Sequence, residues 1–158
     1  MKIINGSPLD IGIISHIIKE ANIPIANRFN ITPINGPAHP SNCKDEWIKG
    51  NMNKGTIYFL YYIDLAPVGV VGIDKKSDLI SIKHLAVLPS YWRNGIGRQL
   101  IEYVITLGRL EGFKYLNLGL IGSNIELMEW YKSIGFVKKR EKKIKNLPYT
   151  ITFMRMTL

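Results

Sequence analysis

The sequence predicts a mixed α/β fold, in which about seven strands form a mainly antiparallel sheet with about four helices on its two faces. Runs of β-branched and aromatic residues between turn residues indicate strands, and apolar residues at helical spacing indicate helices. Their order is β-α-α-β-β-β-α-β-α-β-β. Because consecutive strands occur early and late in this order, antiparallel pairs are favoured. We expect residues 1–158 to form one domain.

The chain opens with a short predicted strand, Lys2–Asn5. A helix-start pattern follows, with Ser7 placed to cap the helix and Asp10 three residues later. We expect this helix to end near residues 21–22, because Pro24 interrupts helical hydrogen bonding.

Residues 22–42 contain four prolines, so we expect a long loop there. A loop of that length in a compact domain is more often functional than idle. Ser41 or Asn42 is placed to cap a short helix over Lys44–Asn53, which Gly55 closes.

Three strands are predicted next, at Thr56–Ile63, Pro67–Asp74 and Leu79–Val87. The strongest helical pattern lies at Gly95–Glu111, followed by a strand at Tyr115–Leu120. A strand, a helix and a further strand in this order favour a parallel crossover between the two strands.

The last helix is expected to begin at a capping box formed by Ser123 and Glu126 and to end at Gly135. Two final strands, Phe136–Lys143 and Tyr149–Met156, complete the predicted order.

Charge and composition favour an anionic partner. Lys and Arg number 21 and Asp and Glu 12, for a formal net charge of +9 at pH 7. Cys43 is the only cysteine, which excludes an internal disulfide, and we expect no metal. No apolar run approaches the roughly 18 residues of a membrane span, and we expect a cytoplasmic protein.

The most informative segment joins the third of these strands to the strongest helix. Gly95 and Gly97 let backbone approach a ligand closely, and the unpaired N–H groups of a helix N-terminus bind anions. Arg93 and Arg98 add charged donors. The segment is not a dinucleotide fingerprint, because Leu100 stands where a third glycine would fall.

Two blocks of the sequence are informative together. The first is the stretch from Ile82 to Leu100, with its Leu-Ala-Val strand end and Gly-x-Gly turn. The second runs from Ser123-Asn124 through Trp130-Tyr131 to Gly135-Phe136. The two blocks resemble those of the GNAT superfamily of N-acetyltransferases, and the similarity in element order covers nearly the whole chain.

The resemblance implies acetyl-CoA as cosubstrate and a primary amine as acceptor. It implies that the backbone of Leu85, Ala86 and Val87 pairs with the pantetheine arm. The pyrophosphate is then expected on the turn made of Arg93, Asn94, Gly95, Ile96, Gly97 and Arg98. Trp92 departs from the Gln or Arg usual in the family.

The resemblance also assigns two residues around the second block. Asn124 matches an asparagine that bonds the pantetheine, and Tyr131 matches a tyrosine that protonates the departing thiolate. Seven residues are about two helical turns, so both side chains are expected on one helix face, about 10 Å apart.

No general base stands out. Many relatives carry a glutamate where this chain has Gly119, and His84 is the candidate that remains on the strand. Glu46, Asp64 and Glu126 are no better supported, and a water relay is an alternative.

A Cys–His pair could serve a covalent route, and Cys43 lies four residues from His39. A free cysteine is usually inert packing, so we expect direct transfer in a ternary complex instead.

Two other functions remain open from the sequence. One is a non-catalytic CoA-binding regulatory module, which the glycine at position 119 leaves open. The other is a nucleic-acid-associated protein that uses the basic run Lys138–Lys145, although no interleaved aromatic residues support it. Homodimerisation through a sheet edge is also expected to be possible.

Overall fold

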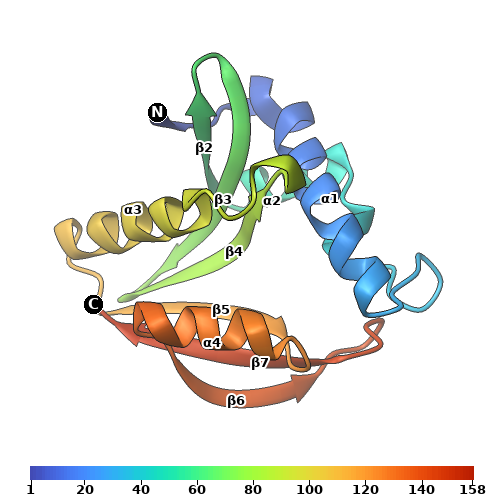
Figure 1. Ribbon diagram of the computed structural model, residues 1–158. Coiled ribbons are helices and arrows are strands. Elements are labelled where there is room, and N and C mark those ends of the chain that lie inside the picture. The colour runs from blue at the N-terminus through green and yellow to red at the C-terminus, as the bar shows by residue number, and fades with distance from the viewer.

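One seven-stranded sheet, in the order β1-β2-β3-β4-β5-β7-β6, organises the computed structural model, which describes residues 1–158 (Figure 1). The strands are β1 Lys2–Asn5, β2 Ile57–Ile63, β3 Ala66–Lys76, β4 Leu79–Val87, β5 Tyr115–Ile121, β6 Val137–Lys143 and β7 Thr150–Thr157. The helices are α1 Ile11–Arg28, α2 Asp45–Asn53, α3 Ile96–Leu110 and α4 Ile125–Ile134. All strand pairs are antiparallel except β4 with β5. The predicted fold class and element order are confirmed.

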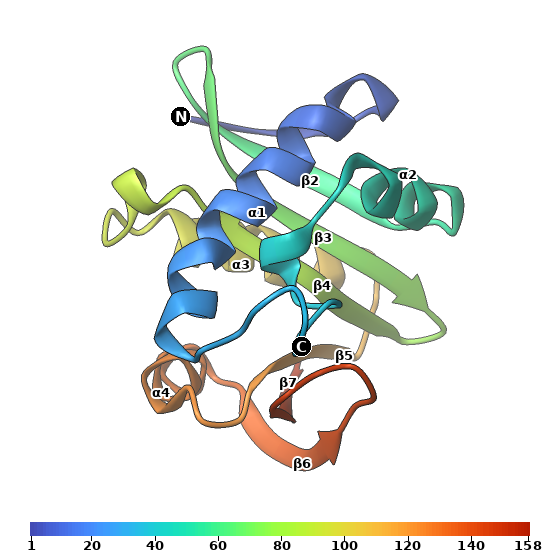
Figure 2. The ribbon, with the colours of Figure 1, turned by 90° about the vertical axis from the view of Figure 1, so that its right-hand side faces the viewer.

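The helices cover both faces of the sheet. Alternate residues of a strand point to opposite faces, so Phe59 of β2 packs toward α3 and α4 while Tyr58 packs toward α1. Leu100 of α3 and Ile17 of α1 are fully buried, one on each side. Figure 2 looks onto the face that α1 crosses, with α3 behind the sheet.

Helix α1 is longer than predicted. It continues through Pro24 to Arg28 instead of ending at residues 21–22. The last turns are held by packing, because Ala26 is buried in a cluster with Ile31 and with Ile121 of β5. Such burial offsets the hydrogen bond that a helix proline removes, at a cost of about 3 kcal/mol.

Two predicted helix caps are wrong. Helix α2 begins after Lys44, and Ser41 and Asn42 instead belong to a short 3₁₀ turn at Pro40–Asn42. Helix α4 is capped by Asn124, not Ser123, because the Asn124 side-chain oxygen accepts from the N–H of Leu127 at 3.3 Å.

Ser7 caps a 3₁₀ turn at Pro8–Asp10, and α1 itself begins three residues later, at Ile11. The remaining predicted boundaries agree with the structure to within two residues, and β4 agrees at both ends. None of the helices is long and apolar enough to span a membrane.

Candidate active site

The site begins where β4 and β5 separate. Their parallel ladder contains three residue pairs and ends with Ser81 beside Asn117. Beyond Ser81 the two strands diverge, as Figure 1 shows. This opening leaves the end of β4 without a neighbour on the side that faces β5.

The register of β4 decides which backbone groups face the opening. Leu88 donates its N–H to the carbonyl of Val68 at 2.9 Å, and antiparallel ladders bond alternate residues. The N–H and C=O groups of Ala86 therefore point toward β3, whereas those of Leu85 and Val87 point into the opening. Of the three predicted strand-end residues, two present backbone groups there.

The predicted anion-binding turn has the expected backbone geometry. Gly95 precedes α3 with a left-handed φ of 74°, and Arg93 is also left-handed with φ 63°. The first hydrogen bond of α3 runs from the N–H of Gln99 to the Gly95 carbonyl at 3.0 Å. The N–H groups of residues 96–98 consequently lack a backbone partner, and the helix dipole adds partial positive charge beside them.

The polar side chains of this turn already have partners within the protein. Arg93 lies 3.6 Å from Glu126 of α4, and Arg98 lies 2.9 Å from Glu102. Asn94 donates its side-chain amide to the carbonyl of Tyr91 at 3.2 Å. Each arginine is therefore held by a surface carboxylate in this structure.

Trp92 has a contact that the sequence did not reveal. Its indole N–H donates to the carbonyl of Val87 at 2.6 Å, so the turn is fastened to the end of β4. A tryptophan that follows a strand does not predict such a hydrogen bond, because the bond depends on how the turn folds back toward the strand. The sequence showed only a departure from the family pattern.

Tyr131 is buried in an aromatic group. Its ring packs edge-on against Trp130 at 4.9 Å and Phe136 at 5.5 Å between centroids. Burial raises the pKa of Tyr131 well above its ordinary value, so the phenol stays protonated at neutral pH. The hydroxyl has no hydrogen-bond partner within the protein and is not sealed from solvent. It is a proton donor without a competing contact.

Asn124 has a structural role in addition to its predicted one. Its side-chain oxygen caps α4, and the residue is 4% exposed. The side-chain NH₂ group is not used by the cap and remains the part able to donate to a ligand.

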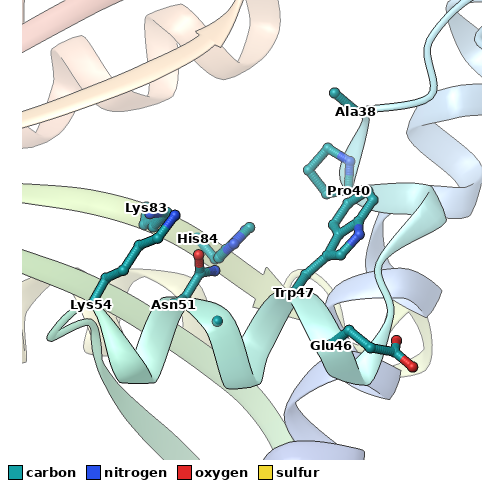
Figure 3. Close-up of a pocket in the computed structure, with 9 residues that line it drawn as sticks. Ala38, Pro40, Glu46, Trp47, Asn51, Lys54, Lys83 and His84 are labelled. Carbon is teal, nitrogen blue, oxygen red and sulfur yellow. The ribbon is translucent and has the colours of Figure 1, made fainter.

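A cavity of about 400 Å³ lies on the sheet face that α1 and α2 cover, between β4 and α2 (Figure 3). A β-bulge at Lys83 turns both Lys83 and His84 toward it. Trp47 of α2 and Lys54, which directly follows α2, also line it, whereas the carboxylate of Glu46 points away from His84 in Figure 3.

His84 stacks on Tyr58 with ring centroids 6.1 Å apart. Burial, assisted by the charge of Lys83, lowers the pKa of His84 to about 4. The imidazole is therefore neutral at pH 7, and it is a weak base.

The structure does not bring Cys43 and His39 together. The His39 ring nitrogen Nδ1 lies 2.7 Å from the Ser41 hydroxyl, and burial raises the pKa of Cys43 to about 11. A thiol with that pKa is not an activated nucleophile at neutral pH.

Glu126 and Asp64, the other carboxylates considered as a base, have structural roles. Glu126 pairs with Arg28 at 3.8 Å as well as with Arg93, and Asp64 forms the turn between β2 and β3. A Cβ atom at Gly119 would lie 3.0 Å from a methyl of Ile151, so a larger side chain there requires Ile151 to move.

Comparison with known proteins agrees with this geometry. The sequence model of the Acetyltransferase (GNAT) family matches residues 26–136, which include the turn, Asn124 and Tyr131. The chain therefore belongs to the GNAT acetyltransferase family, and the acyltransferase class predicted from the sequence is confirmed.

Solved structures share the fold at low sequence identity. The ribosomal-protein-S18-alanine N-acetyltransferase of Escherichia coli is 19% identical with a TM-score of 0.80, over 99% of this chain and 92% of that one. The ribosomal-protein-alanine N-acetyltransferase of Brucella melitensis is 16% identical with a TM-score of 0.73, over 100% of both chains. A putative acetyltransferase from Salmonella typhimurium, solved with its cofactor acetyl-CoA, is 19% identical with a TM-score of 0.71, over 100% of this chain and 94% of that one.

Proposed function

We propose that this protein transfers the acetyl group of acetyl-CoA to a primary amine, by direct attack in a ternary complex. The observation that carries the proposal is the set of unpaired backbone groups along one path. They begin at the N–H groups of residues 96–98 and continue to Leu85 and Val87 in the opening between β4 and β5. An anionic end joined to an amide-bearing arm fits this path, and acetyl-CoA has both.

Each part of the path has a distinct task. The α3 N-terminus, with Gly95 and Gly97, would hold the pyrophosphate. Leu85 and Val87 would pair with the pantetheine amides, and the Asn124 NH₂ group would donate to the same arm. The carbonyl of Val87 is already bonded to Trp92, so only its N–H is left to pair with the arm. A backbone N–H of the strand near Val87 would polarise the thioester carbonyl.

The chemical step needs one proton donor and one proton acceptor. The amine nitrogen forms a bond to the thioester carbonyl carbon, the carbon–sulfur bond breaks, and the thiolate takes the Tyr131 proton. The amine loses its proton to water or to neutral His84, which faces the cavity of about 400 Å³. The acceptor would enter between the loop after α1, helix α2 and the C-terminal strands.

A non-catalytic CoA-binding module is the second candidate, because β5 carries no acidic residue and position 119 is glycine. Two measurements separate the candidates. Acetyl-CoA at 100 times its Kd should add about 2.7 kcal/mol, which for this size of domain raises Tm by roughly 5–11 °C, with ATP and NAD as controls. Thiol release with a panel of amines then tests turnover. A Tm shift without thiol release favours the module, and no shift contradicts both.

A further inference from the structure

A second cavity, of about 310 Å³, opens on the C-terminal half of the sheet. It is lined by Asn117, Lys139, Arg140, Phe153, Met154 and Arg155. Leu116 and Leu118, the neighbours of Asn117, pack into the core beneath α3 and α4, so the cavity lies on the opposite face. On that face α1 and α2 pack mainly over β2 to β4, and only the C-terminal end of α1 reaches β5, at Ile121 (Figure 2).

The polar groups of this cavity are almost all donors. The Arg155 guanidinium lies 4.7 Å from the ring centre of Tyr115 and donates through Nε to the Asn117 side-chain oxygen at 2.8 Å. Arg140 lies 4.6 Å from the ring centre of Phe153. Neither arginine forms a salt bridge, and no carboxylate lines the cavity. Two positioned guanidinium groups with no anion of their own are suited to carboxylate or phosphate oxygens.

The register places this cavity beside the start of the opening between β4 and β5. Asn117 pairs with Ser81, the last β4 residue before the opening, and Arg155 pairs with Asn117 from the other side. Gly119, two residues further along β5, is about 7 Å away and lies next to the opening. Lys54 adds positive charge near the same face of β4, where Lys83 is paired with Asp74 at 3.5 Å.

We propose that the acceptor carries an anionic group, a carboxylate or a phosphate monoester, close to its reactive amine, and that Arg140 and Arg155 bind it in this cavity. The inference rests on the proposed function and names its substrate class. The acceptor amine reaches the opening beside Gly119 while the anion occupies the cavity around Asn117. An acceptor with a neutral or cationic group at that place leaves both guanidinium groups without an anion.

The test uses peptide pairs that differ only in charge. In some pairs the acceptor is a free N-terminal alanine, and in the others it is a single lysine in a peptide with a capped N-terminus. One member of each pair carries Asp, and the other Asn, at one of the three positions that follow the acceptor. A third set carries phosphoserine, which separates phosphate from carboxylate recognition. Binding to the CoA-bound protein is measured by calorimetry, and turnover by thiol release. We expect the anionic member of a pair to bind about tenfold tighter or more.

Three variants identify the cavity. Arg140→Ala on the exposed β6 strand should abolish the preference through KM with little change in kcat, and Arg140→Glu should favour a lysine-containing peptide. Lys143→Glu reverses a charge on the same strand outside the cavity and is the matched control for Arg140→Glu. Arg155→Ala should act like Arg140→Ala, with its Tm measured because Arg155 also bonds Asn117.

The outcomes are separable. Equal affinity for the charged and neutral members overturns the inference, whatever the turnover. Absence of thiol release with every amine contradicts the proposed function, while the calorimetric preference still tests the cavity. Tighter binding of a single-stranded oligonucleotide than of any anionic peptide, lost in Arg140→Glu, would assign the face to nucleic acid and also overturn it.

Discussion

The indole N–H of Trp92 and the carbonyl of Val87 are joined by a hydrogen bond of 2.6 Å. This bond connects the anion-binding turn to the end of β4, the two parts of the proposed acetyl-CoA path. It also removes one of the backbone acceptors that face the opening. The turn and the strand end are therefore positioned relative to each other before any ligand binds.

Replacing Trp92 with Phe should weaken acetyl-CoA binding. The ring is kept and the hydrogen bond, worth about 0.5–1.5 kcal/mol, is lost, so Kd should rise about two- to tenfold. Calorimetry with acetyl-CoA measures it, and Tm reports any loss of folding. An unchanged Kd would show that the bond does not organise the turn.

Replacing Tyr131 with Phe should lower kcat by about 100-fold or more while the Kd for acetyl-CoA stays nearly constant. The reason is that burial keeps the phenol protonated and its hydroxyl has no other partner. Because its pKa is raised, wild-type activity should show no loss from Tyr131 ionisation below pH 10. Equal kcat in the variant would exclude the acid role.

Acidification should destabilise the protein through His39, which is buried, and His84, which is half-buried. Burial lowers the pKa of both His39 and His84 from 6.5 to about 4, so the unfolded chain binds protons more readily. Their contribution to the free energy of unfolding is complete above pH 6.5 and is lost as the pH falls toward 4. Urea denaturation at pH 7 and pH 5 should show a smaller difference in His84→Asn. Replacement of the exposed His16 is the control.

The same substitution at two glycines should have opposite effects. Gly95→Ala forces a side chain into φ 74° and should cost about 1–2 kcal/mol, with weaker acetyl-CoA binding. Gly12→Ala, inside α1 and with no atom within 4 Å of the new Cβ, should stabilise by about 0.5–1 kcal/mol. Chemical denaturation of the two variants tests the pair, and stabilisation by Gly95→Ala would contradict the assigned turn geometry.

The elements that local patterns specify could be predicted from the sequence. The boundaries of β4 and the glycine before α3 follow from alternation and turn residues. The predicted end of the first helix before Pro24 was wrong. Ala26 packs against β5, about a hundred positions further along the chain, and no local pattern reveals that contact. The cap at Asn124 in place of Ser123 depends on which of two adjacent polar residues the backbone turns inward.

The candidate site was predictable where its chemistry is in the backbone and less so where it depends on side chains. The turn at residues 93–98 could be located from its glycines. The stacking of Arg140 on Phe153 and of Arg155 on Tyr115 could not, because each pair joins residues on different strands. The sequence therefore showed a basic run without aromatic residues, whereas the sheet brings the two together.

Only three residue pairs join β4 to β5, so the sheet consists of two half-sheets that meet along a short seam. Strands β1 to β4 lie on one side of the seam, and strands β5, β7 and β6 lie on the other. A substrate that pairs with Leu85 and Val87 would lie in this seam and extend it. The protein would then be most rigid, and its two halves most firmly connected, when the substrate is bound.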